Sequence, residues 1–339
     1  MLAIIYTILI FGVLIFVHEL GHFLAARLSG VTVLEFAIGM GPAIFKKQGK
    51  KTLYSIRLLP IGGYCSMEGE TEESDAPGAF KKASKPRRAI ILAAGVTMNF
   101  LVGFLLMLTT FIGTEVYSTK TVAEFNTADA LSNQTGLMVN DTVQKVNGTT
   151  IFTANDIVFA LLRDDDGIVE MDVLRDGKTV HLSGVEFKVS GEGENRTLDL
   201  DFKVYGEKAS FLGAFSQALD GTISLVRNTW VSLGDMVTGR VGISELSGPV
   251  GVGEVVSQAA QIGWQSVIMI AAFLSISLGI FNSLPIPALD GGHLLLLLIE
   301  AIRGKPLNQK LEGILTVIGF AFFILLFIVV TISDVIKLF

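Results

Sequence analysis

Long apolar runs alternate with polar stretches along this chain, and four of the runs are long enough to cross a lipid bilayer. A transmembrane helix needs roughly 20 consecutive, mainly apolar residues. The runs cover 2–28, about 89–113, a stretch that begins near Trp264, and about 313–332. Two prolines within the sequence Asn-Ser-Leu-Pro-Ile-Pro, residues 282–287, break the third run. This pattern predicts a polytopic α-helical membrane protein with four transmembrane helices.

The region between the second and third runs has a different character. Residues 116–207 are polar and acidic, and their short stretches of alternating apolar side chains are typical of β-strands. A helix is expected over 154–162, followed by strands over 168–175 and 179–182, which an Asp-Gly hairpin turn joins. We therefore expect an α+β domain inserted between membrane helices.

The loop after the first apolar run is expected to be β-rich. Residues from Val31 to Phe36 include many with high strand propensity, and Gly39, Gly41-Pro42 and Gly62-Gly63 predict turns. A membrane-proximal β-hairpin and an ordinary β-rich linker both agree with these local signals.

Residues 209–239 repeat apolar positions at helical spacing, but their other face is too polar for a span. Such a helix either lies on the membrane surface or packs on the inserted domain.

Taken in order, these patterns divide the chain into segments with the following expected bounds. They are a first transmembrane helix at 1–28, a β-rich membrane-associated loop at 29–88, a second transmembrane helix at 89–114, the α+β domain at 116–207, an amphipathic and linker region at 208–262, a third transmembrane helix at 263–302 and a fourth at 312–333.

The composition supports a membrane protein and excludes some other classes. The chain is 50% hydrophobic and 17% charged, whereas soluble domains carry about 25% charged residues. No basic tract with interleaved aromatic side chains points to nucleic acid. The single cysteine, Cys65, excludes an intrachain disulfide and a four-cysteine zinc site. Because no Lys or Arg precedes Arg27, the first run lacks the basic start of a signal peptide and is expected to be a retained helix.

Positive charge is concentrated in two loops. Residues 29–88 are rich in Lys and Arg, and Arg303, Lys305 and Lys310 precede the fourth apolar run. Loops of this kind stay on the cytoplasmic side of a membrane. Both loops are therefore expected in the cytoplasm, with the two termini and the α+β domain outside.

The chemistry of the chain is concentrated in its first apolar run, at His18-Glu19-Leu20-Gly21-His22. Residues i and i+4 share one face of a helix, so both imidazoles can bind the same metal ion. Glu19 lies beside them and can act as a base toward a water molecule at that metal. Ionisable groups at membrane depth cost several kcal/mol unless they are paired or bind a metal. A metal site is therefore favoured over two helix histidines that neighbouring helices satisfy.

A third ligand must come from elsewhere, because catalytic zinc takes three protein ligands and keeps one position open. Asp290 and His293 follow the proline break, where irregular backbone is tolerated only if it is buried or lines a wet cavity. The two glycines after Asp290 allow close approach of the backbone, which favours Asp290 as the ligand. His293 stays open as the ligand or as a hydrogen-bonding partner of the site. Asp290 is also a good residue to cap the helix that follows.

Together these motifs resemble those of the site-2 protease family of intramembrane metalloproteases, in its bacterial regulator of sigma-E protease branch. The matching residues are H-E-x-x-H at 18–22, F-x-x-G-x-G-P at 36–42, P-x-G-G-Y at 60–64, S-G-P-V-G at 247–251 and N-x-x-P-x-P-x-L-D-G at 282–291. The second helix carries Ala94-Gly95 and Asn99 but has Val96 where the family usually has Pro, so a changed local helix geometry is expected there. Residues 136–148 resemble the G-L-x-x-G-D-x-I-x-x-V-N-G run of a PDZ domain, with Asn140 in place of Gly. Many members of the branch have two PDZ domains, whereas this region has room for one.

This resemblance implies a zinc endopeptidase. His18, His22 and Asp290 would bind Zn²⁺, Glu19 would be the general base, and Asn282 would hydrogen-bond the substrate backbone. The substrates would be single-pass proteins of the bacterial cytoplasmic membrane, such as anti-sigma factors or remnant signal peptides, in regulated intramembrane proteolysis. The PDZ-like domain would lie outside and filter or dock substrates already shortened by another protease.

Two other classes of function compete with this one. A catalytically inert membrane scaffold that presents a PDZ-like domain would be expected to lack Glu19 or a metal ligand. A zinc transporter would need further carboxylates along a path through the four spans.

Overall fold

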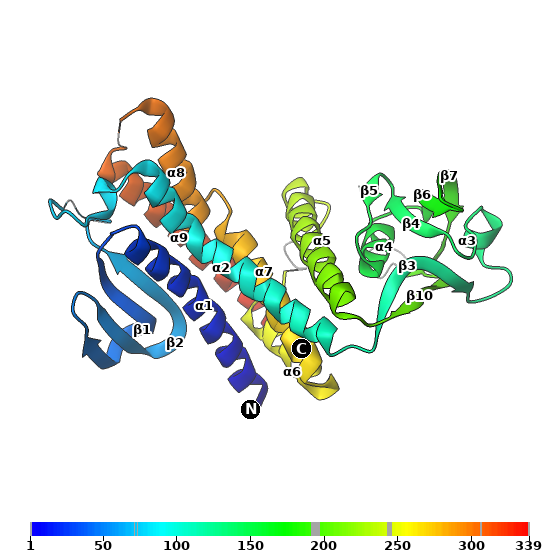
Figure 1. Ribbon diagram of the computed structural model, residues 1–339, viewed down its shortest axis with the longest axis horizontal. Coiled ribbons are helices and arrows are strands. Elements are labelled where there is room, and N and C mark those ends of the chain that lie inside the picture. The colour runs from blue at the N-terminus through cyan, green and yellow to red at the C-terminus, as the bar shows by residue number, and fades with distance from the viewer. Residues whose placement is uncertain are drawn as a thin grey trace. The chain divides into compact units, whose positions relative to one another are not determined.

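A computed structural model describes residues 2–70, 72, 74–190, 197–242, 246–305 and 307–337. The chain forms two compact units (Figure 1). The helical unit comprises Met1–Leu106 and Thr229–Phe339, and the sheet unit comprises Met107–Asn228.

The helical unit contains the expected membrane helices. Four described helices are long and apolar enough to cross a membrane, which confirms the prediction of four spans. They are α1 (Leu2–Leu28), α2 (Lys85–Ile112), α7 (Trp264–Asn282) and α9 (Gln309–Lys337). Two shorter helices, α6 (Pro249–Ile262) and α8 (Asp290–Arg303), and a 3₁₀ turn at Phe80–Lys82 accompany them.

The predicted third membrane segment consists of two helices, because the prolines end α7 before α8 begins. Between them the chain makes tight turns, in which the N–H of Ile286 donates to the carbonyl of Leu284 at 2.8 Å. A Cβ on Gly291 would lie 2.2 Å from the carbonyl oxygen of Ser283, and one on Gly292 would lie 2.2 Å from that of Ile286. Only glycine therefore lets the proline-containing loop fold back against the start of α8.

The Ser-Gly-Pro-Val-Gly segment fixes α6 to α9. The N–H of Gly251, in the first turn of α6, donates to Asp334 Oδ2 of α9 at 2.8 Å. Asp334 is buried, and its negative charge lies at the positive end of the α6 dipole. A Cβ on Gly248 would lie only 2.8 Å from the same carboxylate oxygen, so these glycines let the two helices meet.

A long antiparallel hairpin, β1 (Val33–Gln48) and β2 (Leu53–Met67), packs beside α1 (Figure 1). Of the hairpin and the ordinary linker that the sequence left open, the structure shows the hairpin, but the turns predicted at Gly39, Gly41 and Gly62 are wrong. These glycines have positive φ angles of +86°, +83° and +83°, and the strand pairing shifts register repeatedly along the hairpin. Bulges thus bend the strands without ending them.

The sheet unit has the strand order β10-β3-β4-β6-β7, with β5 paired to β4. Its elements are β3 (Val116–Phe125), α3 (Leu131–Gln134), β4 (Thr142–Val146), β5 (Thr149–Thr150), α4 (Ala154–Leu162), β6 (Ile168–Arg175), β7 (Lys178–Glu186), β8 (Lys188–Ser190), β9 (Thr197–Asp199) and β10 (Phe202–Lys208). The helix and strands predicted over 154–162 and 168–175 are confirmed, and the following strand is longer than expected. Buried aliphatic side chains such as Val143, Ile157 and Val173 form the core between α4 and the sheet.

Asp141 organises the segment that resembles a PDZ domain. Its fully buried carboxylate accepts hydrogen bonds from Arg175 Nε and Nη2, both at 2.7 Å, and from the N–H of Met138 at 2.8 Å. Asn140 has a φ of +74°, so it takes the left-handed conformation expected of a residue that replaces Gly.

The first part of α5 (Phe211–Thr238) packs on α4 within the sheet unit (Figure 1). Asp156, fully buried at the start of α4, accepts hydrogen bonds from Ser224 Oγ and from Asn228 Nδ2, the latter at 3.0 Å. Arg227 Nη2 lies 2.8 Å from the same carboxylate. Of the two positions considered for this amphipathic helix, the structure therefore supports packing on the domain for the part up to Asn228.

Candidate metal centre

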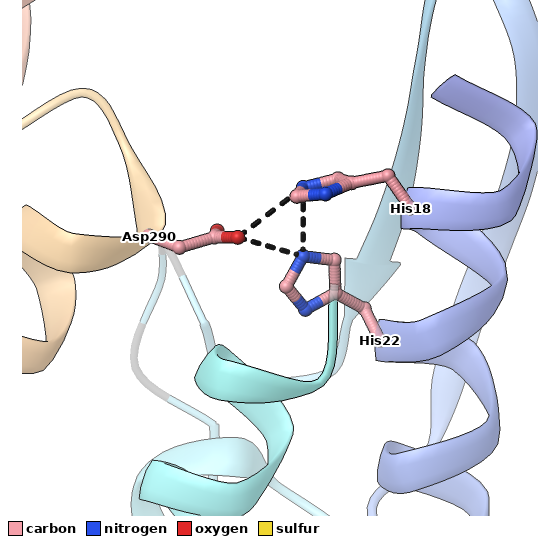
Figure 2. A group of neighbouring side chains, drawn as sticks. All are labelled: His18, His22 and Asp290. Atoms are coloured by element: carbon pink, nitrogen blue, oxygen red, sulfur yellow. Dashed lines mark hydrogen bonds and ion pairs between the residues drawn. The ribbon is translucent and has the colours of Figure 1, made fainter. Parts of the chain in front are cut away.

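Three side chains from distant parts of the sequence converge in the helical unit (Figure 2). His18 and His22 extend from one face of α1, and Asp290 comes from the first turn of α8. The two Nε2 atoms are 3.2 Å apart, and Asp290 Oδ2 lies 3.2 Å from that of His18 and 3.1 Å from that of His22. Both histidines are 7% exposed. The three donor atoms therefore form a nearly equilateral, buried triangle.

This triangle fits a zinc ion. Ligand atoms about 2.0–2.1 Å from a tetrahedral zinc ion lie roughly 3.3 Å from one another, and catalytic sites commonly combine three such ligands with an open fourth position. Asp290 Oδ2 is buried without a hydrogen-bond donor. Two nitrogen lone pairs and a carboxylate oxygen at these distances would repel one another without a cation between them. The two histidines and Asp290 are the group of potential metal ligands found in the part of the chain that the structure describes.

A backbone carbonyl orients His22. The Nδ1 atom of this ring lies 2.8 Å from the carbonyl oxygen of Ile91 in α2. A carbonyl only accepts hydrogen bonds, so Nδ1 carries the proton and the lone pair of Nε2 faces the triangle.

The side chain of Asn99, also in α2, orients His18. Its amide lies 3.1 Å from His18 Nδ1 and is fully buried, and its Oδ1 atom has no partner when Nδ2 faces the ring. When His18 binds a metal through Nε2, its Nδ1 carries a proton. A half-turn of the amide then lets Oδ1 accept that proton, which satisfies both groups.

Glycines bring α1 and α2 close enough for these contacts. A Cβ on Gly95 would lie 2.3 Å from His22 Nε2 and 2.7 Å from His18 Cε1, and one on Gly21 would lie 2.5 Å from the carbonyl oxygen of Ala94. Sequence reasoning noted that Asn99 was retained but gave no role to either residue of α2. The signal was present, since Gly95 and Asn99 are four residues apart and share the helix face toward the histidines. The helix continues through Val96 without a break.

Glu19 lies between the triangle and the hairpin. It interacts electrostatically with His18, His22 and Asp290, and it hydrogen-bonds the backbone of Cys65 in β2. A Cβ on Gly63 would lie 3.2 Å from Glu19 Cγ, so the Gly-Gly of the hairpin lets the strand approach this carboxylate. Glu19 is half-buried and is not part of the donor triangle.

The structure separates the two residues considered as third ligand. Asp290 joins the triangle, whereas His293 lines a neighbouring cavity of about 390 Å³ together with Glu70 and Glu312. The capping alternative for Asp290 is wrong, because Leu289 is the N-cap of α8 and no side chain caps the helix there. Sequence reasoning missed Glu70. Burial raises the pKa of its carboxyl group, although the N–H of Met67 donates a hydrogen bond to it.

Asn282 is the last residue of α7, on the other side of the proline-containing loop from Asp290. Its side chain is half-buried, and within the described ranges no hydrogen bond joins it to the triangle. Its expected contact with a substrate backbone stays a prediction.

Replacing Asn99 by Leu should weaken zinc binding about 10–100-fold, the usual effect of removing a hydrogen-bonding partner behind a metal ligand. The buried Nδ1–H of His18 would lose its acceptor, while the side chain keeps its size. Titration of the detergent-solubilised protein with zinc against a competing chelator measures this affinity. Asn99→Asp, which still accepts the proton, should retain tight binding, and Thr97→Leu at an exposed position of α2 serves as the matched control. Equal affinities for wild type and Asn99→Leu would contradict the assigned role.

Sequence comparison with known proteins relates this chain to metalloproteases. The sequence model of peptidase family M50 matches residues 6–326. The chain is 36% identical over 334 residues to a protein of Clostridium acetobutylicum whose name describes a zinc metalloprotease, covering 98% of this chain and 97% of that protein. It is 32% identical over 413 residues to the regulator of sigma-W protease RasP of Bacillus subtilis and 31% identical over 415 residues to the zinc metalloprotease RasP of Shouchella clausii, with 98% of both chains covered in each case.

Proposed function

Because this chain belongs to peptidase family M50 and is a zinc metalloprotease of the site-2 type, we propose that it hydrolyses peptide bonds within or next to transmembrane segments of other proteins. The observation that carries this proposal is the buried His18–His22–Asp290 triangle. Its two histidines lie within the membrane-spanning part of α1, with Glu19 beside them. Ionisable groups at membrane depth mark functional sites, so this site is positioned for substrates in the same layer.

The proposed roles follow from the position of each side chain. His18, His22 and Asp290 would hold Zn²⁺, which would act as a Lewis acid and lower the pKa of a water molecule at the site. Glu19 accepts a proton from the attacking water and returns it to the amine that leaves. Ile91 and Asn99 keep the two imidazoles in the protonation state that binds the ion.

The substrate is expected to bind in an extended form. A helix hides its backbone amides, so the segment to be cut must unwind locally. The β1–β2 hairpin is two-stranded and its strand β2 contacts Glu19, so strand addition to this hairpin would carry the extended segment to the base. The half-buried amide of Asn282 is available to hydrogen-bond the same backbone.

The proposed topology follows the charge of the loops. The many Lys and Arg residues of 29–88 and those of 303–310 support a cytoplasmic position for these loops. The protein would then be a multi-pass protein of a bacterial cytoplasmic membrane, surrounded by lipid, with both termini and the PDZ-like sheet unit outside.

The sheet unit is proposed to select substrates. Its Asp141–Arg175 pair and left-handed Asn140 support the PDZ-like reading of residues 136–148. It would dock or filter single-pass proteins already shortened outside the membrane. Anti-sigma factors are one expected class, since a relative is named regulator of sigma-W protease, and remnant signal peptides are another. A catalytically inert scaffold is disfavoured because Glu19 and all three donor groups are present and close together.

Reconstitution tests the proposal directly. The full chain and a single-pass reporter would be placed together in liposomes, and fragments would be mapped by mass spectrometry. Cleavage should fall within or beside the transmembrane segment, stop when a chelator removes zinc, and return when zinc is added back. An intact reporter, or cuts confined to its soluble parts, would refute intramembrane proteolysis.

A further inference from the structure

A basic pocket lies where α1 leaves its apolar span, apart from the metal centre. Its volume is about 450 Å³. Its lining residues include Arg27, Lys50, Lys51, Thr32, Thr52 and Tyr54, together with others of the segment 30–33. Three cationic residues thus line one pocket, and none of its lining residues is acidic.

The local structure fixes the backbone that carries these residues, whose side chains are exposed. The N–H of Gly49 donates to the carbonyl of Thr52 at 2.8 Å, so Lys50 and Lys51 occupy the two central positions of the hairpin turn. Thr52 is buried, and its hydroxyl donates to the carbonyl of Val33 at 2.9 Å, which ties this turn to the start of β1. On the other wall, Arg27 lies over the ring of Phe23, 5.5 Å from its centroid.

The three cations have no acidic partner among the described residues, where the recorded ion pairs involve other side chains. Like charges around a common pocket repel one another, and an anion between them removes this repulsion. The pocket therefore favours a ligand with a negative charge and oxygen acceptors.

The position of the pocket favours a membrane lipid as the source of that anion. Arg27 is in the last turn of α1, whose membrane-spanning part ends at Leu28. Leu24 and Leu28, on the same stretch of helix, are 45% and 89% exposed. A phosphate in the pocket would consequently have room for acyl chains against exposed apolar side chains of α1. Basic pockets at the ends of membrane helices bind lipid head groups in this way.

We propose that Arg27, Lys50 and Lys51 form a binding site for the phosphate head group of an anionic phospholipid such as phosphatidylglycerol. The lipid would join the tip of the β1–β2 hairpin to the end of α1 and hold the hairpin at the membrane surface. The site involves none of the residues assigned to zinc or to proton transfer, and its test needs no proteolytic activity.

Native mass spectrometry of the full chain from micelles measures the site. Wild type should retain phosphatidylglycerol in preference to phosphatidylcholine. Lys50→Gln together with Lys51→Gln should weaken this retention about 25-fold, or about five-fold for each cation removed. The matched control is Lys46→Gln with Lys47→Gln, which removes the same charge from exposed positions of the same hairpin outside the pocket. Thermal unfolding of both double variants confirms that each is folded.

The arms of the experiment separate a defined site from its alternatives. Equal losses in the two double variants would show diffuse attraction to the basic loop and overturn the proposal, as would unchanged retention in the Lys50, Lys51 variant. Millimolar inorganic phosphate should leave bound phosphatidylglycerol in place. Displacement by phosphate, or a rise in the wild-type melting temperature with phosphate but not with phosphatidylglycerol, would assign the pocket to the free ion and overturn the lipid.

Discussion

Glu19→Gln should abolish peptide cleavage and leave zinc bound. Glutamine has the shape of glutamate but cannot accept a proton at neutral pH, and removing a general base costs about 10²–10⁴-fold in rate. Its side-chain oxygen can still accept the hydrogen bond at the backbone of Cys65, so the hairpin should keep its place beside α1. The donor triangle is untouched, because Glu19 is not one of its members.

Two measurements on the same preparation check this expectation. Cleavage of the membrane-embedded reporter gives the rate, and elemental analysis of the washed protein gives bound zinc per chain. Glu254→Gln, at an exposed position of α6, makes the same chemical change away from the site and should cleave like wild type. Unchanged cleavage by Glu19→Gln would remove the base assignment. Loss of zinc together with activity would show that Glu19 acts in metal binding.

Asp290→Ala should release zinc, whereas His293→Ala should retain it. Removing Asp290 leaves only two nitrogen ligands in a buried site. It also removes the negatively charged member of the donor triangle. The loss of zinc affinity should exceed the roughly 10–100-fold effect of removing a residue that only hydrogen-bonds a metal ligand. His293 lies on the neighbouring cavity with Glu70 and Glu312, so its replacement should change zinc content little.

Zinc content and activity of both variants decide between the two residues, and a chelator-treated wild-type sample shows the state without metal. Asp290→Asn separates charge from shape, since it keeps a similar side chain in the first turn of α8 and should still lose most of the zinc. Release of metal by His293→Ala alone would reverse the assignment of the third ligand.

The sequence by itself determined the features that depend on local spacing. Hydrophobic runs specified the four spans, because only a long apolar helix satisfies its backbone within lipid. The i, i+4 separation placed His18 and His22 on one face of α1, since the geometry of a helix fixes that relation. The prolines before Asp290 likewise specified an interruption at membrane depth, and α7 and α8 are separate helices for that reason.

The turns assigned to the hairpin show where local signals are ambiguous. A glycine with positive φ serves a turn and a bulge equally well, and only the pairing across strands distinguishes them. Gly39 and Gly62 lie within paired strands, so they belong to bulges and not to turns. The sequence likewise did not decide whether the amphipathic helix at 209–239 lies on the membrane surface or packs on the inserted domain. The contacts of Asp156 with Ser224 and Asn228 link this helix to α4.

Only the tertiary structure decided which distant groups meet. Sequence spacing left Asp290 and His293 as alternatives, and the fold brings Asp290 Oδ2 to 3.1 Å from His22 Nε2. It also gave Gly95 and Asn99 their roles, because their contacts with the histidines depend on how closely α1 and α2 approach. Helical periodicity fixes which residues share a face of one helix, but the partner of that face depends on packing over the whole unit. For this reason the histidine pair could be read from the sequence, while its third donor and the groups that orient it required the fold.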